Sequence, residues 1–215
     1  SMLAAEKFGV DPAAVDVPHS DTAIAPYGLA TYGSRSLPVG GVAIANACDG
    51  VIDKARQIAA HQLEANPDDL EFSGGVFRVK GSPDTEMPLA AVAWAAFTAH
   101  NLPDGMEPNL EHHTHYDPPN FSWPFGTHMC AVEIDTETGQ VEVLKYVAVD
   151  DCGVQVNPLI VDGQVHGGVI QGLAQALYEG AVYDTDGNLK NSTLAEYLVP
   201  AASDVPPITL GNTVT

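Results

Sequence analysis

Apolar residues recur at helical spacing in three long stretches of the chain. Between residues 42 and 63 they fall at steps of three and four, which predicts a helix with one continuous apolar face. Residues 88–99 read PLAAVAWAAFTA and begin with proline, a residue favoured in the first helical turn. The dipeptide Asn157-Pro158 opens a third predicted helix, which is expected to end near Gly180.

Two segments alternate apolar and polar residues on both sides of a turn, a pattern that predicts β-hairpins. One covers residues 70–79 around Gly-Gly, and the other covers residues 128–149 around TETG. The last residues of the chain are expected to be extended, with no closing element. Weaker patterns predict a short strand over 14–17, a strand and turn over 181–189, and a short helix or strand over 193–199.

Together these elements predict an α+β fold with two-layer packing of helices on antiparallel β-hairpins. The 215 residues suit one large domain or two small ones, and the 45% apolar content is enough for a sizeable core. We expect one partial domain over residues 1–215, with two lobes, 1–125 and 126–215, as the alternative division.

The predicted helix that begins at Pro158 is rich in glycine. The glycines are Gly163, Gly167, Gly168 and Gly172. Each glycine in a helix interior costs about 1 kcal/mol relative to alanine, so the four together cost roughly 4 kcal/mol. Side chains are therefore absent for a reason: either a neighbouring backbone packs against the helix or a ligand lies against it. The concentration of glycine in the first half, with glutamine and histidine interspersed, favours the ligand.

The charge balance limits the classes of molecule that this chain is expected to bind. With 8 basic and 28 acidic residues the net charge is −20, which argues against nucleic acid and anionic membrane surfaces. No run of 18 apolar residues occurs, so no membrane insertion is expected. The 3 cysteines lack the spacing of a zinc ribbon or a four-cysteine iron–sulfur site. A reduced, cytoplasmic protein is the simplest interpretation.

The sequence TYGSRS, residues 31–36, places Arg35 between two serines just before a predicted helix. It belongs to a long loop over residues 20–41, and long loops inside compact domains are usually functional. Backbone N–H groups, hydroxyls and a guanidinium at a helix start suit a phosphate or another anion. A helix cap with a surface arginine explains the same residues equally well.

Residues 150–168 offer a second candidate site, because a strand end and a loop again lead into the start of a helix. Cys152 lies in this loop and is a potential nucleophile. No base or orienting partner stands at a characteristic spacing from it, so a buried structural thiol is the preferred interpretation.

Histidines gather in the sequence EHHTHYDP. His112, His113 and His115, with Asp117, raise the question of a zinc site. A catalytic zinc needs three well-oriented ligands and an open position, and nothing in the sequence orients this loop. We therefore assign no metal ligand.

Three stretches of the chain, 25–36, 120–158 and 163–179, resemble the molybdopterin-binding large subunit of the xanthine dehydrogenase/aldehyde oxidase family, and in particular its carbon monoxide dehydrogenase type. The resemblance extends from about residue 3 to about residue 206. It implies a molybdopterin cofactor, commonly the cytosine dinucleotide with molybdenum. It also implies oxidative hydroxylation of carbon monoxide, an aldehyde or an N-heterocycle with oxygen from water, and partner subunits that carry iron–sulfur centres and FAD.

The resemblance further implies which residues contact the cofactor, with Arg35 and Gln164 the strongest. The expected contacts are Gly33, Ser34, Arg35, Ser36, Asp151, Cys152, Asn157, Ile160, Val161 and Gln164. The glycine-rich helix would lie against the dinucleotide, with its N-terminus toward the pyrophosphate.

The chain departs from the family pattern in two respects. Family members use a glutamate in a glycine-rich stretch as general base, and no such stretch occurs here. Large subunits are also several times longer. We therefore expect a fragment that is inactive alone, and we assign no catalytic residue. In particular, Cys152 and Glu196 are given no catalytic role. A non-catalytic interaction domain and a metal hydrolase using residues 112–117 remain the alternatives.

Overall fold

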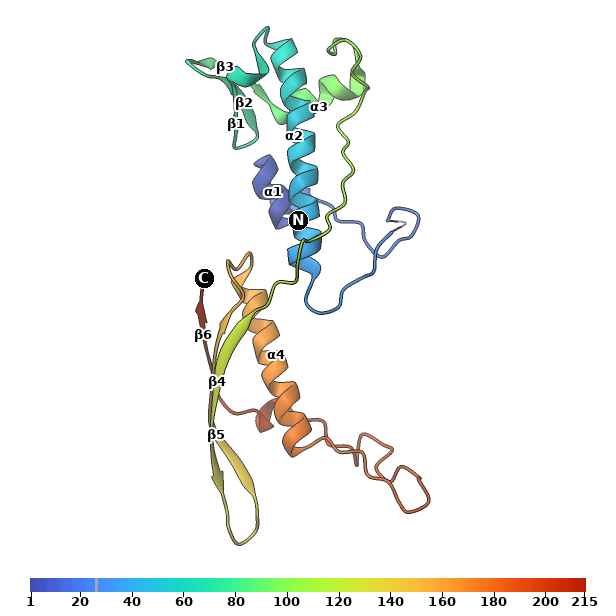
Figure 1. The fold of residues 1–215 in the computed structure, drawn as a ribbon, viewed down its shortest axis with the longest axis vertical. Helices are drawn as coiled ribbons and strands as arrows, with labels where there is room; N and C mark the ends of the chain where they lie inside the picture. The colour runs from blue at the N-terminus through green and yellow to red at the C-terminus, as the bar shows by residue number, and fades with distance from the viewer. Residues whose placement is uncertain (26) are drawn as a thin grey trace. The chain divides into compact units, whose positions relative to one another are not determined.

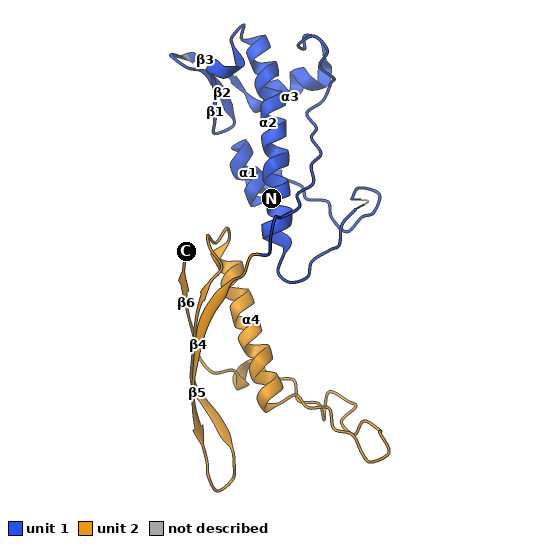
Figure 2. Ribbon diagram, viewed as in Figure 1, with its two compact units in different colours: residues 1–121 blue, residues 122–215 orange. Residues whose placement is uncertain are grey.

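The structure is a computed structural model that describes residues 1–25 and 27–215. Pro26, in the predicted loop 20–41, lies outside the described residues. The chain divides into two compact units, unit 1 over residues 1–121 and unit 2 over residues 122–215 (Figure 2). We describe each unit by itself.

Unit 1 joins three helices to a small antiparallel sheet of order β1-β2-β3 (Figure 1). Three short turns of 3-10 or π-helix connect these elements. In chain order the elements are α1 Met2–Phe8, η1 Pro12–Ala14, η2 Ser36–Gly41, α2 Val42–Gln62, η3 Pro67–Asp69, β1 Leu70–Ser73, β2 Val76–Val79, β3 Ser82–Pro88 and α3 Leu89–Thr98.

The core of unit 1 lies where one face of α2 meets the sheet and α3. Ile58 of α2, Phe77 of β2 and Val92 of α3 are completely buried and belong to one hydrophobic cluster. The apolar steps of three and four between residues 42 and 63 therefore correspond to the buried face of α2, and the predicted helix is confirmed. The hairpin over 70–79 is also confirmed, since β1 and β2 pair directly around Gly-Gly.

Unit 2 is a three-stranded sheet of order β4-β5-β6 with one long helix. Strands β4, Phe125–Ile134, and β5, Val141–Asp151, pair antiparallel and form the second predicted hairpin. Helix α4, Pro158–Leu177, is the predicted glycine-rich helix. After the 3-10 turn η4, Ala202–Asp204, strand β6, Ile208–Thr213, pairs parallel with β5. The α+β fold class is confirmed.

Four local predictions were wrong or incomplete. Residues 14–17, all described, form no strand, because the chain makes the 3-10 turn η1 and finds no partner strand. Residues 193–199 form turns and neither a helix nor a strand, and 181–189 reduce to a single bridge around a turn. The tail forms β6, and β3 was not predicted, because both strands depend on partners that a local pattern does not reveal.

None of the described helices is long and apolar enough to cross a membrane.

Candidate cofactor-binding site

The TYGSRS loop of unit 1 has an unusual backbone. Ala30, Gly33 and Ser34 have φ angles of 57°, 56° and 57°, in the left-handed region that non-glycine residues rarely adopt. For the non-glycine residues Ala30 and Ser34 this conformation costs of order 1–3 kcal/mol each, and such residues cluster at functional sites. Arg35 returns to right-handed backbone at φ −77°. The backbone thus changes from left-handed at Ser34 to right-handed at Arg35, and the Arg35 amide donates to the Tyr32 carbonyl at 3.3 Å.

Arg35 is held in place by its own loop. Its Nε donates to the Ala30 carbonyl at 2.8 Å, and its guanidinium lies 4.4 Å from the centre of the Tyr32 ring. The Ser36 hydroxyl contacts the Thr31 hydroxyl at 2.7 Å. Arg35 is half-buried, while the serines on either side of it are exposed. The loop therefore presents a fixed positive charge beside two exposed serines.

Arg35 is also the residue from which the long helix of unit 1 begins. Ser36 is the first residue of the π-helical turn η2, and η2 continues directly into α2. Short π-helical segments occur frequently at functional sites. The predicted helix start after TYGSRS is confirmed, although it is a π-turn where an ordinary α-helical turn was expected.

In unit 2, the end of β5 is fastened to β6 by Asp151. This carboxylate is buried, with 3% exposed surface. One oxygen accepts from the Gly153 amide at 2.9 Å, and the other accepts from the hydroxyls of Thr213 at 3.0 Å and Thr215 at 3.2 Å. The side chain of Asp151 is thus occupied inside the protein, and its predicted cofactor contact stays a prediction. The two threonines are hydrogen-bond partners that the sequence analysis did not identify.

The bonds to Asp151 make the stability of unit 2 dependent on pH. The Gly153 amide, followed by the hydroxyls of Thr213 and Thr215, holds the pKa of Asp151 below its ordinary value, against the opposing effect of burial. The folded pKa is therefore the lower one. The stabilisation is complete above the unfolded pKa of about 4 and is lost as the pH falls through the folded pKa.

We therefore expect Asp151→Asn to lower the urea midpoint at pH 7. The difference from the unsubstituted chain should shrink as the pH falls below about 4, because the carboxylate then protonates first in the unfolded state, and should vanish once the pH has passed the lower folded pKa. Circular dichroism at a series of pH values measures this. Asp104→Asn, an exposed position in unit 1, serves as the control and should shift the midpoint little. A difference that stays constant down to the lowest pH would contradict the assignment.

Helix α4 begins with a side-chain cap. The Asn157 side chain accepts from the Ile160 amide at 3.3 Å, and Pro158 occupies the first helical position. Gly153, at φ 73°, turns the chain between β5 and this cap. The loop therefore connects the end of β5 to the positive end of the α4 dipole in seven residues, 151–157.

The two sides of α4 differ in composition and burial. Val165 and Val169 lie four residues apart on the packed side, where Val169 is buried, and Val161 belongs to the same side. Ile160, Gln164 and the four glycines are all exposed. Gly163 and Gly167 flank Ile160 on the side away from Val165, whereas Gly168 and Gly172 border the packed side, seven residues after Val161 and Val165. The structure therefore groups two predicted contacts, Ile160 and Gln164, on one face. The side chain of Val161 is half-buried among the packing residues.

The glycine face of α4 is open. A Cβ added at any one of its four glycines would meet no atom of the described residues within 4 Å. Packing against a backbone within the described part of the chain thus does not account for the glycines. We call the exposed surface that Ile160, the four glycines and Gln164 form on α4 the glycine face.

The thiol of Cys152 is exposed. The preference for a buried structural thiol at this position was therefore wrong. Cys152 follows β5 directly, where the chain leaves the sheet, so it has no hydrophobic layer to enter. Its predicted contact with the cofactor stays a prediction.

The histidine loop does not assemble a metal site from the described residues. The ring of His112 packs against α2, where a Cβ on Gly50 would stand 2.5 Å from it. His113 pairs with Glu111 at 2.9 Å, and the His115 ring contacts that of Tyr27 at 6.0 Å between centroids. The three histidines thus have three separate partners. No group of three or more histidine, cysteine, aspartate or glutamate side chains in the described part of the chain could hold a metal ion.

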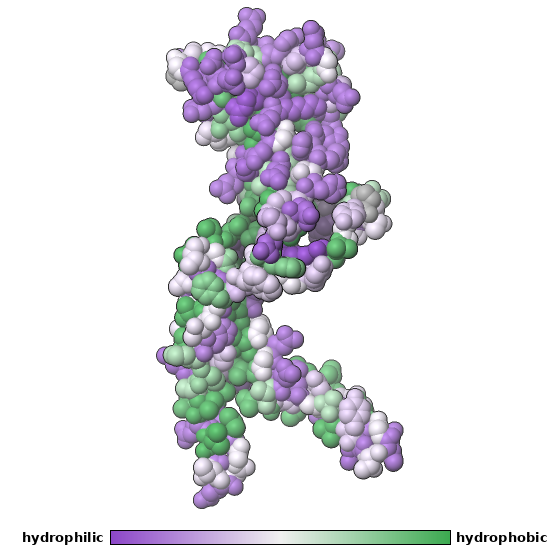
Figure 3. Space-filling view, in the orientation of Figure 1, coloured by the Kyte–Doolittle hydropathy of each residue, from purple (hydrophilic) through white to green (hydrophobic). Residues whose placement is uncertain are grey.

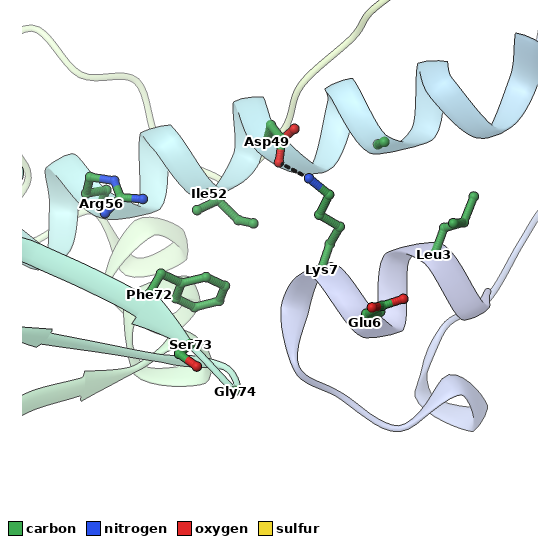
Figure 4. A pocket seen from close by; sticks show the side chains of 10 residues that line it. Leu3, Glu6, Lys7, Asp49, Ile52, Arg56, Phe72, Ser73 and Gly74 are labelled. Atoms are coloured by element: carbon green, nitrogen blue, oxygen red, sulfur yellow. Dashed lines mark hydrogen bonds and ion pairs between the residues drawn. The ribbon is translucent and has the colours of Figure 1, made fainter. Parts of the chain in front are cut away.

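A cavity of about 580 Å³ lies elsewhere in unit 1, between α1, α2 and the β1–β2 turn (Figure 4). The ion pair between Lys7 and Asp49, at 2.6 Å, spans it, and Arg56 and Phe72 line its other end. None of the predicted cofactor contacts lines this cavity. Each unit therefore has its own candidate segment, the TYGSRS loop in unit 1 and residues 151–164 in unit 2.

The α+β fold and the glycine-rich helix are those of a class of protein that sequence comparison identifies. The chain belongs to the molybdopterin cofactor-binding domain family, whose sequence pattern matches residues 1–206. It corresponds to part of a molybdopterin-binding large subunit of the carbon monoxide dehydrogenase and xanthine dehydrogenase type.

Individual relatives agree with this family. The chain is 44% identical over 215 residues to the carbon monoxide dehydrogenase large chain of Hydrogenophaga pseudoflava and 39% identical to that of Afipia carboxidovorans. It is 33% identical over 208 residues to the nicotine 6-hydroxylase large subunit of Paenarthrobacter nicotinovorans. These matches cover 96–100% of this chain and 26% of each relative, so the chain spans about a quarter of their length.

Solved structures share the fold. The crystal structure of Cu,Mo-CO dehydrogenase in its carbon monoxide reduced state superimposes with a TM-score of 0.92 at 39% identity, covering 99% of this chain and 26% of that one. Quinoline 2-oxidoreductase from Pseudomonas putida 86 gives a TM-score of 0.80 at 38% identity, covering 88% of this chain and 24% of the other.

Proposed function

We propose that this chain supplies one wall of a molybdopterin cytosine dinucleotide site in the large subunit of a molybdenum hydroxylase. The observation that carries the proposal is the glycine face of α4, which is open within the described chain and begins at a capped helix N-terminus. A helix start binds phosphate through its N–H groups and dipole, and glycine lets a ligand approach the backbone closely.

The TYGSRS loop supports the same function. The fixed guanidinium of Arg35 and the serines beside it suit a phosphate. Such a positive charge is uncommon in a chain whose net charge is −20. We assign the phosphate contacts to the backbone of Gly33 and Ser34, to the Ser36 hydroxyl and to Arg35. On α4 we assign contacts to Gln164 and Ile160, with the loop residues Cys152 and Asn157 at its start.

The role of these residues is to bind and orient. The glycine face excludes side chains from the ligand surface, Gln164 offers both a donor and an acceptor, and Arg35 balances negative charge. When bound, the cofactor supplies the molybdenum redox chemistry of oxidative hydroxylation. None of the ten site residues is assigned a catalytic role.

The whole enzyme is proposed by extension from the relatives. The parent reaction would be hydroxylation of carbon monoxide, an aldehyde or an N-heterocycle with oxygen from water. Electrons would pass to iron–sulfur and FAD centres on partner subunits. The 215 residues alone are expected to be inactive, because they span about a quarter of the relatives' length.

Cofactor content tests the proposal. We graft the 215 residues in place of the matching quarter of the Hydrogenophaga pseudoflava large chain and measure pterin and cytidine nucleotide per subunit. Gln164→Leu should lower both at least threefold, because it removes hydrogen bonds to the ligand worth about 1 kcal/mol. Gln175→Leu is the matched control, an exposed glutamine about 16 Å further along the same helix, and should leave both unchanged.

Each outcome has a distinct meaning. A content of about one pterin and one nucleotide per grafted subunit, lowered by Gln164→Leu but not by Gln175→Leu, would support the site. Equal occupancy in the two variants would reject Gln164 as a contact. A folded graft without pterin or nucleotide would reject the proposed function and favour a non-catalytic interaction domain.

A further inference from the structure

Strand β4 lies at an end of its sheet and is exposed along its whole length. The sheet order β4-β5-β6 leaves one edge of β4 without a partner strand among the residues that the structure describes. All ten of its residues, 125–134, are exposed. The neighbouring strand β5, by contrast, has partners on both sides over residues 146–151, where it contains the buried residues Ala148 and Asp151.

The side chains of β4 are those of a buried strand. Figure 3 shows hydrophobic residues gathered over the strands of unit 2. Phe125 and Met129 lie on one face of β4 and are 60% and 65% exposed. Val132 and Ile134 lie on the other face, at 48% and 55%. A strand that is apolar on both faces is typical of the interior of a sheet, covered on both sides.

Strand β4 has few of the devices that protect natural edges: one register shift against β5, at Ala131/Val132, and one charged residue, Glu133. Soluble proteins interrupt exposed edge strands with lysine, proline or inward-pointing charge, or keep them very short. The sequence FGTHMCAVEI contains no lysine, arginine or proline, and Glu133 is its single carboxylate. Its ten residues exceed the usual strand length of about 5–6. An edge of this length and composition is suited to pairing with another strand.

The greater length of the relatives indicates what pairs with the open edge of β4. In Cu,Mo-CO dehydrogenase the same fold, with a TM-score of 0.92, forms 26% of a much longer chain. We propose that β4 is an interior strand in the complete large subunit. Its open edge pairs with a strand from the polypeptide outside these 215 residues, and apolar side chains of that polypeptide cover Phe125 and Met129. This proposal does not depend on the cofactor.

Amide hydrogen exchange resolved by mass spectrometry tests the pairing. In an antiparallel pair, roughly half of the β4 amides point to the open edge. In the dilute monomeric chain these should exchange as fast as loop amides, while β5 amides are protected. In the graft within the Hydrogenophaga pseudoflava large chain, the same β4 amides should exchange at least a hundredfold more slowly. Strand β5 is the internal control for folding.

Two results would overturn the proposal. One is fast exchange of the outward β4 amides in a graft whose β5 remains protected. The other is slow exchange of β4 in the dilute monomer, which would show that another part of this chain already covers the edge. If the graft fails to protect β5, the matching strand of the unmodified Hydrogenophaga large chain is measured, and fast exchange there contradicts the proposal equally.

Discussion

Gly168→Ala is expected to stabilise this chain and to weaken cofactor binding in the complete subunit. The added methyl group meets no described atom within 4 Å, so the helix gains the propensity difference of about 1 kcal/mol in the free energy of unfolding. On the proposed cofactor wall, the same methyl group would intrude on a close contact. Overpacking costs about 1–3 kcal/mol, so binding should weaken by roughly five- to 150-fold.

Urea denaturation of the chain and pterin content of the grafted subunit measure the two effects. Gly172→Ala, one turn further from the helix start, should give the same stabilisation and shows how far along α4 the ligand reaches. Stabilisation without loss of pterin in Gly168→Ala would mean that no ligand touches the glycine face there. Destabilisation of the isolated chain would mean that the face is already packed.

Arg35→Ala is expected to remove most of the cofactor from the grafted subunit without unfolding it. Charge-assisted hydrogen bonds to phosphate contribute about 1.5–3 kcal/mol, so the loss corresponds to roughly ten- to 150-fold in affinity. Arg35→Lys should restore occupancy only in part, because an ammonium keeps the charge but loses the planar fork and the stacking on Tyr32.

Arg78→Ala is the matched control. Arg78 lies on β2, pairs with Glu86 at 2.8 Å and is similarly accessible to solvent, yet it lies outside the candidate site. The Arg78→Ala variant should leave the pterin content of the grafted subunit unchanged. Equal losses in Arg35→Ala and Arg78→Ala would point to a general charge effect. Normal occupancy in Arg35→Ala would reject the TYGSRS loop as a phosphate site.

Elements with a strong internal period were predictable from the sequence. The face of α2 that includes Ile58 and the direct hairpin of β1 and β2 depend on residues close together in the chain. Strand β6 was not predictable, because its pairing with β5 joins Tyr146 to Ile208 across a long separation. The bond from Thr213 to Asp151 follows from the same pairing and was equally hidden.

The candidate site was predictable in type but not in detail. The glycines of α4 indicated that part of the helix surface is open. The sequence did not show which other side chains of the helix lie beside them. Gln164 is exposed, whereas Val161 is half-buried. The position of the sheet decides which side of α4 is packed, and the sequence alone does not give that position. Likewise, Asp151 resembled a ligand contact in sequence, whereas buried hydrogen bonds occupy its carboxylate.

The fastening of Asp151 to Thr213 and Thr215 also sets an order of events during synthesis. The two hydroxyls follow their carboxylate by 62 and 64 residues. At a ribosomal rate of about 5–20 residues per second, roughly 3–13 s pass between them. During that interval the β4–β5 hairpin and α4 have already been made, while the loop between them lacks its anchor. A newly made chain thus anchors the loop that follows β5 only after β6 and Thr215 have been translated.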